Sequence, residues 1–524
     1  MPGKKLTVPK AIRANIVKTV GLVAVKPRSP DETFAELFHS TQTKNILGDN
    51  KAFVDLVPKK APAMVLKAYQ LEAQQPDFNL EDFIGRNFYN LTKTKDRSLD
   101  QPNLNPEQHI KQLWGDLTVT NRRDRGSLLA LPYEYIVPGG RFQEQFYWDS
   151  YFIMLGLATE NQWRLIEGMM KNYTYMIRRF GLIPTANRSY FLTRSQPPFF
   201  SHMVELLSQH RGDYATVEYL PYLLKERQFW MRGSRKLRSD YQAMRRVVRL
   251  PDDLILNRYF DDRPSPRPES YIQDIETVST ATRERYDSMY LHLRAAAESG
   301  WDFSSRWFAD PHDLGTIHTT DIVPIDLNCL LYHLESTIAK AYRLIKQHKL
   351  AKTYETVAAS RAAAIEQYCW NEQHQFFHDY DFVRREATPS ATLAALFPLY
   401  VGLASRKQAA AVATRLEQDF LRAGGLATTL IENDQQWDMP NGWAPLHYVT
   451  IKGLERYGHQ KLADTIRQRW LATNRLVFER HHKFIEKYDV VHPGELGGGG
   501  EYELQDGFGW TNGVFETLSD TSLH

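Results

Sequence analysis

The chain has 524 residues, of which 42% are hydrophobic and 24% charged, an average soluble composition that excludes a disordered chain. Its 65 Lys and Arg against 62 Asp and Glu leave a net charge of only +3, which disfavours a nucleic-acid-binding protein. Cys329 and Cys369 stand outside any CxxC pair or metal-ligand spacing, so we expect neither structural zinc nor a disulfide framework.

The amino-terminal segment is basic and contains no acidic residue up to Pro30. Its longest uncharged apolar stretch, residues 19–25, is interrupted by Gly21 and lacks the small-residue cleavage pattern of a secretory signal. We therefore predict a flexible basic extension over residues 1–31 and a cytoplasmic protein. Because no stretch approaches the roughly 18 apolar residues that a bilayer requires, we expect no membrane span.

Helical periodicity dominates the rest of the chain. Between Leu327 and Ile345, apolar residues recur every three or four positions, which predicts a helix with one buried face. Similar patterns cover residues 151–180, 270–299, 353–368, 391–405, 407–421, 443–457 and 461–474. Short breaks separate these patterns, as in antiparallel helical hairpins, and no sharp repeat marks an open array. We predict one all-α domain over residues 32–524, closed into a toroid.

Three Trp-Asp dipeptides lie in the segments between these helices, at residues 148–149, 301–302 and 437–438. An aromatic ring can stack on the apolar face of a sugar while a carboxylate accepts hydrogen bonds from its hydroxyls. Each Asp could instead be a helix N-cap, and many aromatic rings only fill a core. Three such pairs close to Gly or Pro turns favour a carbohydrate site.

Glycoside hydrolysis needs two carboxyl groups, and Asp302 and Glu486 are candidates among the 62 acidic residues. Arg141, Arg194 and Arg267 lie in loops with Gly, Ser, Gln or Pro, where they are either surface charges or ligands of hydroxyls and carboxylates. The glycine run at 497–500 is followed by an acid rather than by Lys-Ser/Thr, which favours a mobile lid or a close backbone approach to a ligand over a phosphate loop.

Long motifs carry a resemblance to a known family. Residues 138–152 (PGGRFQEQFYWDSYF) and 436–445 (QWDMPNGWAP) resemble the two signature segments of the trehalase family of glycoside hydrolases. The glycine run before Glu501 and residues 505–513 (QDGFGWTNG) look like that family's lid and closing helix. The resemblance, to a cytoplasmic type of the family, extends from about residue 32 to about residue 515.

The resemblance implies an (α/α)6 barrel with long active-site loops, which hydrolyses α,α-trehalose to two glucose molecules with inversion, without a metal or cofactor. It puts Asp302 in the place of the general acid and Glu486 in that of the general base. The residues that it implies for holding the first glucose are Arg141, Trp148, Asp149, Arg194, Ser195, Gln196, Arg267, Pro268, Glu269, Gly300 and, from the lid, Glu501. Thr185 stands where the family has an Asn, which puts that sugar contact in doubt.

Three other classes of function stay open from the sequence. A polysaccharide lyase on the same toroid would need a base beside a uronic acid and a longer groove. A non-catalytic trehalose-binding or sensing protein would not need both Asp302 and Glu486. An open solenoid that binds protein partners would not explain Arg, Trp and Asp together in the loops. We expect a monomer whose partner is trehalose.

Overall fold

The computed structural model describes residues 26–91 and 104–520, and helices make up most of it. The α-helices are α2 (Pro30–Thr43), α3 (Asn50–Asp55), α4 (Pro62–Glu72), α5 (Leu80–Asn87), α6 (Pro106–Asp116), α7 (Tyr147–Thr159), α8 (Trp163–Phe180), α9 (Phe200–Arg211), α10 (Tyr214–Trp230), α11 (Tyr271–Thr280), α12 (Tyr286–Ser299), α13 (Ile325–Leu344), α14 (His348–Cys369), α15 (Phe397–Tyr400), α16 (Arg406–Arg415), α17 (Ala444–Arg456), α18 (Gln460–His481) and α19 (Gly509–Ser519). None of the described helices combines the length and the apolar character that crossing a membrane requires.

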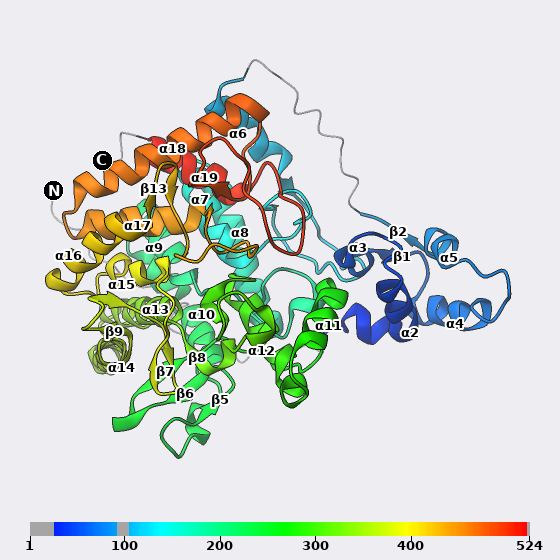
Figure 1. The fold of residues 1–524 in the computed structure, drawn as a ribbon, viewed down its shortest axis with the longest axis horizontal. Helices are drawn as coiled ribbons and strands as arrows, with labels where there is room; N and C mark the ends of the chain where they lie inside the picture. The colour runs from blue at the N-terminus through cyan, green and yellow to red at the C-terminus, as the bar shows by residue number, and fades with distance from the viewer. Residues whose placement is uncertain (1–25, 92–103, 521–524) are drawn as a thin grey trace.

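The strands are short and belong to small antiparallel ladders between the helices (Figure 1). They are β1 (Val57–Pro58), β2 (Phe88–Tyr89), β3 (Thr118–Val119), β4 (Tyr135–Ile136), β5 (Ala243–Met244), β6 (Val247–Arg249), β7 (Ile255–Asn257), β8 (Ile322–Val323), β9 (Trp370–Asn371), β10 (Phe376–Phe377), β11 (Tyr380–Asp381), β12 (Glu386–Ala387), β13 (Leu421–Arg422), β14 (Gly425–Leu426), β15 (Asn441–Gly442) and β16 (Tyr488–Asp489). Pairing of β15 with β16 joins two loops that are distant in sequence, because it holds residues 436–443 beside residues 486–489.

The helices form two concentric layers. An inner ring closes on itself, because α7 packs on α9, α9 on α13, α13 on α15, α15 on α17, α17 on α19 and α19 back on α7. Outer helices cover this ring, with α8 on α7, α10 on α9, α14 on α13 and α18 on α17. This arrangement confirms the predicted closed toroid and is an (α/α)6 barrel.

The burial of the helices follows their sequences. Helix α7 is buried from Tyr147 to Leu157 on every side, as expected for an inner helix whose sequence is apolar all round. Outer helix α8 instead buries one face and ends at Gly181 in the left-handed conformation. The pattern at residues 151–180 is thus two helices rather than one, because the chain turns at Asn161, which has a positive φ.

A similar break divides residues 270–299 into α11 and α12, separated by Ala281 and a short 3₁₀ turn over Arg283–Arg285. Extended φ and ψ angles at Ala281 and Thr282 end the first helix and begin the next turn. Apolar spacing persists across both breaks, so periodicity alone does not reveal them.

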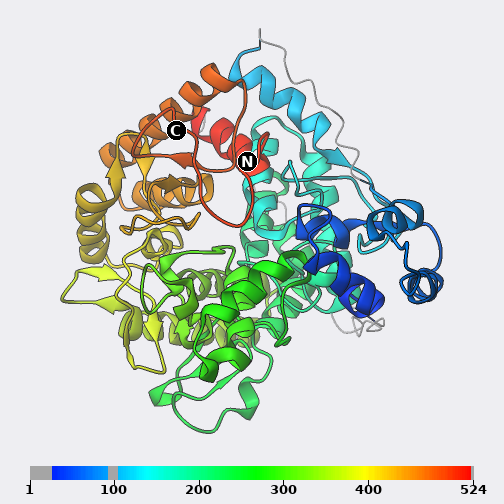
Figure 2. The same ribbon diagram turned by 45° about the vertical axis from the view of Figure 1, so that its right-hand side comes forward.

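Helices α2 to α5 lie to one side of the barrel (Figures 1 and 2). They share a second hydrophobic cluster that includes Phe53 and Phe83, and Phe146 and Phe191 from the barrel loops also join it. Asn50 accepts a hydrogen bond from the Ile272 amide at 2.9 Å, which ties this group of helices to α11. Most of the predicted basic extension, residues 1–25, lies outside the described residues, and α2 begins at Pro30.

Closure of the ring depends on a close approach between α7 and α19. A Cβ atom at Gly513 would lie 2.1 Å from the backbone oxygen of Phe152, too close for any side chain. We therefore expect Gly513→Ala to lower the free energy of unfolding by at least about 1–3 kcal/mol, the usual cost of overpacking. Thermal and urea unfolding would measure this change.

Gly115→Ala is the matched control, because Gly115 lies within α6 and a Cβ there would meet no atom of the described residues within 4 Å. Alanine is favoured over glycine in a helix by up to about 1 kcal/mol, so this variant should be as stable as the parent or slightly more stable. Equal stability of the two variants would contradict the close packing of α7 on α19.

Candidate active site

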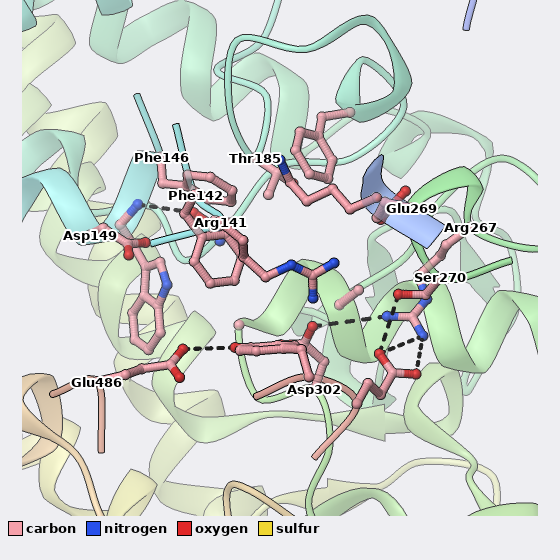
Figure 3. Close-up of a pocket in the computed structure, with 18 of the residues that line it drawn as sticks. Arg141, Phe142, Phe146, Asp149, Thr185, Arg267, Glu269, Ser270, Asp302 and Glu486 are labelled. Atoms are coloured by element: carbon pink, nitrogen blue, oxygen red, sulfur yellow. Dashed lines mark hydrogen bonds and ion pairs between the residues drawn. The ribbon is translucent and has the colours of Figure 1, made fainter. Parts of the chain in front are cut away.

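One pocket gathers most of the residues that the sequence singled out. It has about 760 Å³ of empty space, including the space open to solvent, and lies at the end of the barrel where α7, α17 and α19 begin. The predicted residues that line it are Arg141, Trp148, Asp149, Arg194, Gln196, Arg267, Glu269, Gly300, Asp302, Glu486 and Glu501. Figure 3 shows Asp149, Asp302 and Glu486 around the same space.

The Trp148 ring packs closely against the backbone of Gly300. Gly300 ends α12 with a φ of 74°, in the left-handed region that favours glycine. A Cβ atom on Gly300 would lie 2.9 Å from the Trp148 ring, so the glycine also leaves room for the indole. The Trp148 amide donates to Gln196 Oε1 at 3.2 Å, which fixes the first turn of α7 in the pocket wall.

Asp302 is a carboxyl group that can keep its proton near neutral pH. Its side chain is 32% exposed, and Oδ2 lies 3.9 Å from Nη1 of Arg267. The pKa of Asp302 is raised to about 7, because partial burial and the charge of Glu501 raise it more than the charge of Arg267 lowers it. The side-chain amide of Gln436 donates to the Asp302 carbonyl oxygen and anchors the backbone of this loop.

Glu486 is the most enclosed carboxylate of the pocket, with 1% of its surface exposed. Tyr502 donates a hydrogen bond to Oε1 at 2.7 Å, whereas Oε2 receives no hydrogen bond from the described part of the chain. Lys487 Nζ lies 3.7 Å from Oε2. Burial raises the pKa of Glu486, and Lys487 and the Tyr502 hydroxyl counteract this rise. The carboxylate therefore has one oxygen held and one available to a ligand or a water.

Asp149 lies in the first turn of α7, close to both of these acids. Burial raises the pKa of Asp149 well above its ordinary value, and the charges of Glu486 and Asp302 raise it further. Hydrogen bonds from hydroxyl groups of a ligand would compensate a buried carboxyl group in this position.

Buried arginines face these acids. Arg194 donates to Glu269, but its Nε and Nη1 have no hydrogen-bond partner in the described residues. Arg267 donates to Asp274 Oδ1 at 2.6 Å and to Glu501 Oε1 at 2.9 Å. Unpaired N–H groups of a buried guanidinium are costly, which favours a hydroxylated ligand at Arg194.

Arg141 reaches the pocket beside the lid. It donates to Asp49 Oδ1 at 2.7 Å, and its guanidinium lies 4.8 Å from the centre of the Tyr502 ring. The side chain thus contacts both the amino-terminal helices and the residue that holds Glu486.

Two predicted binding residues do not line the pocket. The Ser195 hydroxyl donates to the Ile183 carbonyl oxygen at 2.6 Å, and the Pro268 carbonyl accepts from Gln42 at 2.9 Å. Thr185 does line the pocket, but its hydroxyl donates to the Ser195 carbonyl at 2.8 Å. The chain therefore uses Ser195 and Thr185 to hold the loop that carries Arg194 and Gln196.

The glycine run is docked against the pocket wall. A Cβ atom on Gly499 would lie 2.4 Å from the Asp434 carbonyl oxygen, and one on Gly500 would lie 2.8 Å from Gln436 Oε1. Lys487 Nζ donates to Gln436 Oε1 at 2.9 Å and to the Gly499 carbonyl at 3.2 Å. The sequence predicted a close backbone approach to a ligand, and the structure shows that these glycines lie close to the neighbouring loop. Because the glycine run is docked here, Glu501 lies next to Arg267 and Tyr502 lies next to Glu486.

Several residues of the pocket were not predicted from the sequence. Tyr502 lines the pocket, and Lys487 lies 3.7 Å from Glu486 without lining it. Neither was singled out, although each directly follows a predicted acid, and that adjacency was the available signal. The other lining residues that were not predicted are Lys51, Phe142, Phe146, Phe191, Ser270, Ala297, Trp443, Phe508 and Trp510, whereas Trp437 of the third Trp-Asp pair does line the pocket. Asp438 of the third Trp-Asp pair instead accepts hydrogen bonds from Ser304 and Ser305 and fixes their loop.

Comparisons with known proteins agree with the fold and show the family. The family model described as Trehalase matches residues 45–521. The chain is 45% identical to a periplasmic trehalase of Escherichia coli O1:K1 over 95% of the chain and 88% of that relative. It is 46% identical to a periplasmic trehalase of Salmonella dublin over 94% of the chain and 87% of that relative.

Solved structures give the same fold. The neutral trehalase Nth1 from Saccharomyces cerevisiae superposes with a TM-score of 0.60 at 27% identity, over 74% of each chain. A GH63 mannosylglycerate hydrolase from Thermus thermophilus superposes with a TM-score of 0.54 at 18% identity, over 79% of this chain and 100% of that one. The second likeness shows the (α/α)6 fold alone.

The predicted cytoplasmic location, and with it the cytoplasmic type of the family, is wrong. Relatives that match 95% of the chain at 45% identity are named periplasmic, which contradicts it. The prediction depended on the length and composition of residues 19–25, which lie outside the described residues. The length of an apolar stretch is therefore not a sufficient criterion for the cellular location of this protein.

Proposed function

This chain belongs to the trehalase family, and we propose that it hydrolyses α,α-trehalose to two glucose molecules with inversion, with Asp302 as general acid and Glu486 as general base. The observation that carries the proposal is that both carboxyl groups line one pocket in different surroundings. Asp302 has a pKa near 7 and can hold a proton, whereas Glu486 has one oxygen bound by Tyr502 and the other available.

In the proposed reaction, Asp302 protonates the oxygen that links the two glucose units, and the bond from that oxygen to one anomeric carbon breaks. Glu486 Oε2 takes a proton from a water that attacks this carbon from the opposite face. The attacked unit leaves as β-glucose and the other as α-glucose. Inversion needs room for the water, so the two carboxyl groups should be about 6.5–9.5 Å apart.

The same pocket offers groups for the sugar hydroxyls and faces. Arg194 Nε and Nη1 make no hydrogen bond within the described residues, although Nη1 lies 3.8 Å from Asp261 Oδ2, and Asp149 is a buried carboxyl group that can accept hydrogen bonds from hydroxyls. Trp148 and Phe142 supply apolar walls for the pyranose rings. Ser195 and Pro268, whose contacts are internal, act through the loops that they hold.

The relatives' names favour a periplasmic location for this chain, and cell fractionation would test it. We also propose that the protein is a monomer and that residues 32–524 form one catalytic domain. Sedimentation of the purified protein would test the monomer.

We expect Asp302→Asn and Glu486→Gln each to lower kcat for trehalose by about 10²–10⁴-fold or more, the usual share of general acid or base catalysis. Glucose release and NMR of the first-formed anomers would measure this effect in the variants and the inversion in the parent. Glu503→Gln is the matched control, because Glu503 is an exposed lid carboxylate.

Parental kcat in either variant, with the fold intact by circular dichroism, would contradict the assigned roles. If both glucose molecules were first released as the same anomer, whether α or β, the result would contradict inversion. Tight trehalose binding without turnover in the parent would favour a sensing protein.

The pH dependence of kcat/KM should be bell-shaped. The acid must be protonated, so activity falls as the pH rises through the Asp302 pKa of about 7. The base must be ionised, so activity falls at low pH, through a Glu486 pKa that lies above its ordinary value. Tyr502→Phe removes a hydrogen bond that favours the carboxylate, so the pKa of Glu486 should rise and the acidic limb should move to higher pH.

Tyr354→Phe, on outer helix α14, is the control for this experiment and should leave the profile unchanged. An unshifted acidic limb in Tyr502→Phe would show that Glu486 is not the group that titrates there.

Docking of the lid should govern substrate capture. Gly499 has a φ of +76°, and a Cβ there would strike the Asp434 backbone, so Gly499→Ala should displace Glu501 and Tyr502. We expect a rise of about tenfold or more in KM for trehalose, measured by steady-state kinetics. Gly498→Ala is the control, since a Cβ at Gly498 meets no described atom within 4 Å. Identical KM values in the two variants would contradict the lid.

A further inference from the structure

A second cavity opens at the opposite end of the barrel, where the inner helices end. It encloses about 2,030 Å³ including the space open to solvent, and none of the described residues that line it also lines the active-site pocket. Leu155 and Ala158 of α7, Leu206 of α9 and Lys452 of α17 contribute to its walls, all from the later turns of their helices. The proposed hydrolysis makes no use of this space.

A layer of aromatic rings separates the two cavities. Phe152, fully buried, contacts Trp148 of the active site and Tyr151 of the second cavity, with ring centres 6.1 Å and 5.2 Å apart. Phe199 stacks on Tyr151 at 5.0 Å. The second cavity is therefore a separate compartment and not an extension of the active site.

The floor of the second cavity is polar and fixed. The hydroxyl groups of Tyr151 and Tyr400 form a hydrogen bond of 2.7 Å. The His202 ring lies between Tyr400 and His333, with centres 5.1 Å and 3.6 Å away. His202 is 4% exposed, and its Nδ1 has no hydrogen-bond partner in the described part of the chain. Burial lowers the pKa of His202 well below its ordinary value, so the ring stays neutral.

One side of the cavity carries groups that suit a hydroxylated ring. His333 is held through Nδ1 by the Ser201 hydroxyl at 2.9 Å and through Nε2 by Glu205 at 3.0 Å. Trp163 and His210 stack face to face, with centres 4.0 Å apart, and present a flat aromatic pair at the wall. A flat ring beside fixed hydroxyl and imidazole groups matches one apolar face and the hydroxyl edge of a pyranose.

The charges around this cavity disfavour an anionic ligand. Lys452 is paired with Glu455 at 2.9 Å, and Arg456 also lines the wall, so that Glu205, Glu455 and Asp520 place three carboxylates against two cations. The carboxyl ends of α7, α9, α17 and α19 lie here, and helix ends of this kind carry partial negative charge. A phosphorylated sugar would be repelled, whereas a neutral sugar would not.

From this arrangement we propose that the cavity at the carboxyl end of the inner helices is a second binding site for a neutral pyranose sugar. The aromatic layer keeps it apart from the reacting carboxyl groups, so it binds sugar without turning it over. The site does not depend on the reaction assigned to the other end of the barrel.

The experiment counts glucose sites on the full chain by calorimetric titration with D-glucose and by crystal soaking. Ala158→Trp places an indole in the cavity at a partly exposed position, and Leu206→Trp does the same from α9 if the first variant misfolds. We expect each folded variant, judged by its thermal midpoint, to lose one glucose site that the parent has. The soaked crystal should show glucose beside Trp163.

A second arm titrates trehalose into Glu486→Gln with and without Ala158→Trp, which tells whether the disaccharide or only the monosaccharide binds there. Equal numbers of glucose sites in the parent and in both blocking variants would overturn the proposal. Occupancy by tetramethylammonium but not by glucose would also overturn it, because the rings would then be a cation site. Neither result depends on trehalose turnover, so failure here is distinguishable from failure of the proposed reaction.

Discussion

Removal of water from a crowded set of carboxyl groups is the constraint on which the active-site pocket depends. Burial raises the pKa values of Asp149, Asp302 and Glu486 alike, and this cost falls on every acid in the same small space. What separates the acids is their partners. Each has a cation nearby, Lys487 at 3.7 Å from Glu486 and Arg267 at 3.9 Å from Asp302, but Glu486 also accepts a hydrogen bond from the Tyr502 hydroxyl. Two chemically similar groups can therefore hold opposite protonation states at one pH.

Buried ion pairs help to fix the loops that carry these groups. Arg306 binds both Asp326 and Asp379 beneath the Asp302 loop, and Arg246 binds Glu298, which accepts a hydrogen bond from the Ser195 amide next to Gln196. Removing one partner of such a pair leaves an uncompensated charge and costs about 3–5 kcal/mol. The cost is the same whether or not the pair touches substrate, so burial of an arginine alone does not identify a binding residue. Its unpaired N–H groups, as at Arg194, are more informative.

The helical hairpins could be predicted from the sequence, because apolar periodicity shows which face of each helix is buried. Their closure into a ring was predicted from the lack of a sharp repeat. Most of the predicted pocket residues followed from the resemblance to the trehalase family, whereas the polar and aromatic residue types alone pointed only to the loops that contain them. The sequence did not reveal the direction of the Ser195 hydroxyl, the role of Lys487 or the contact of Tyr502, since each depends on segments that meet only after folding. Asp438 shows the same limit, because its Trp-Asp motif matches the others although its carboxylate binds Ser304 and Ser305.

The direction of the inner helices explains why the acids gather at one end of the barrel. Each outer helix returns the chain, so α7, α17 and α19 all begin beside the active-site pocket and end beside the second cavity. Helix amino ends carry partial positive charge, which helps to hold carboxylates such as Asp149 in the first turn of α7. Partial negative charge at the other end would make the same cluster of acids more costly there. The topology therefore gives the two ends different chemistry, with proton transfer suited to one and recognition of neutral groups to the other.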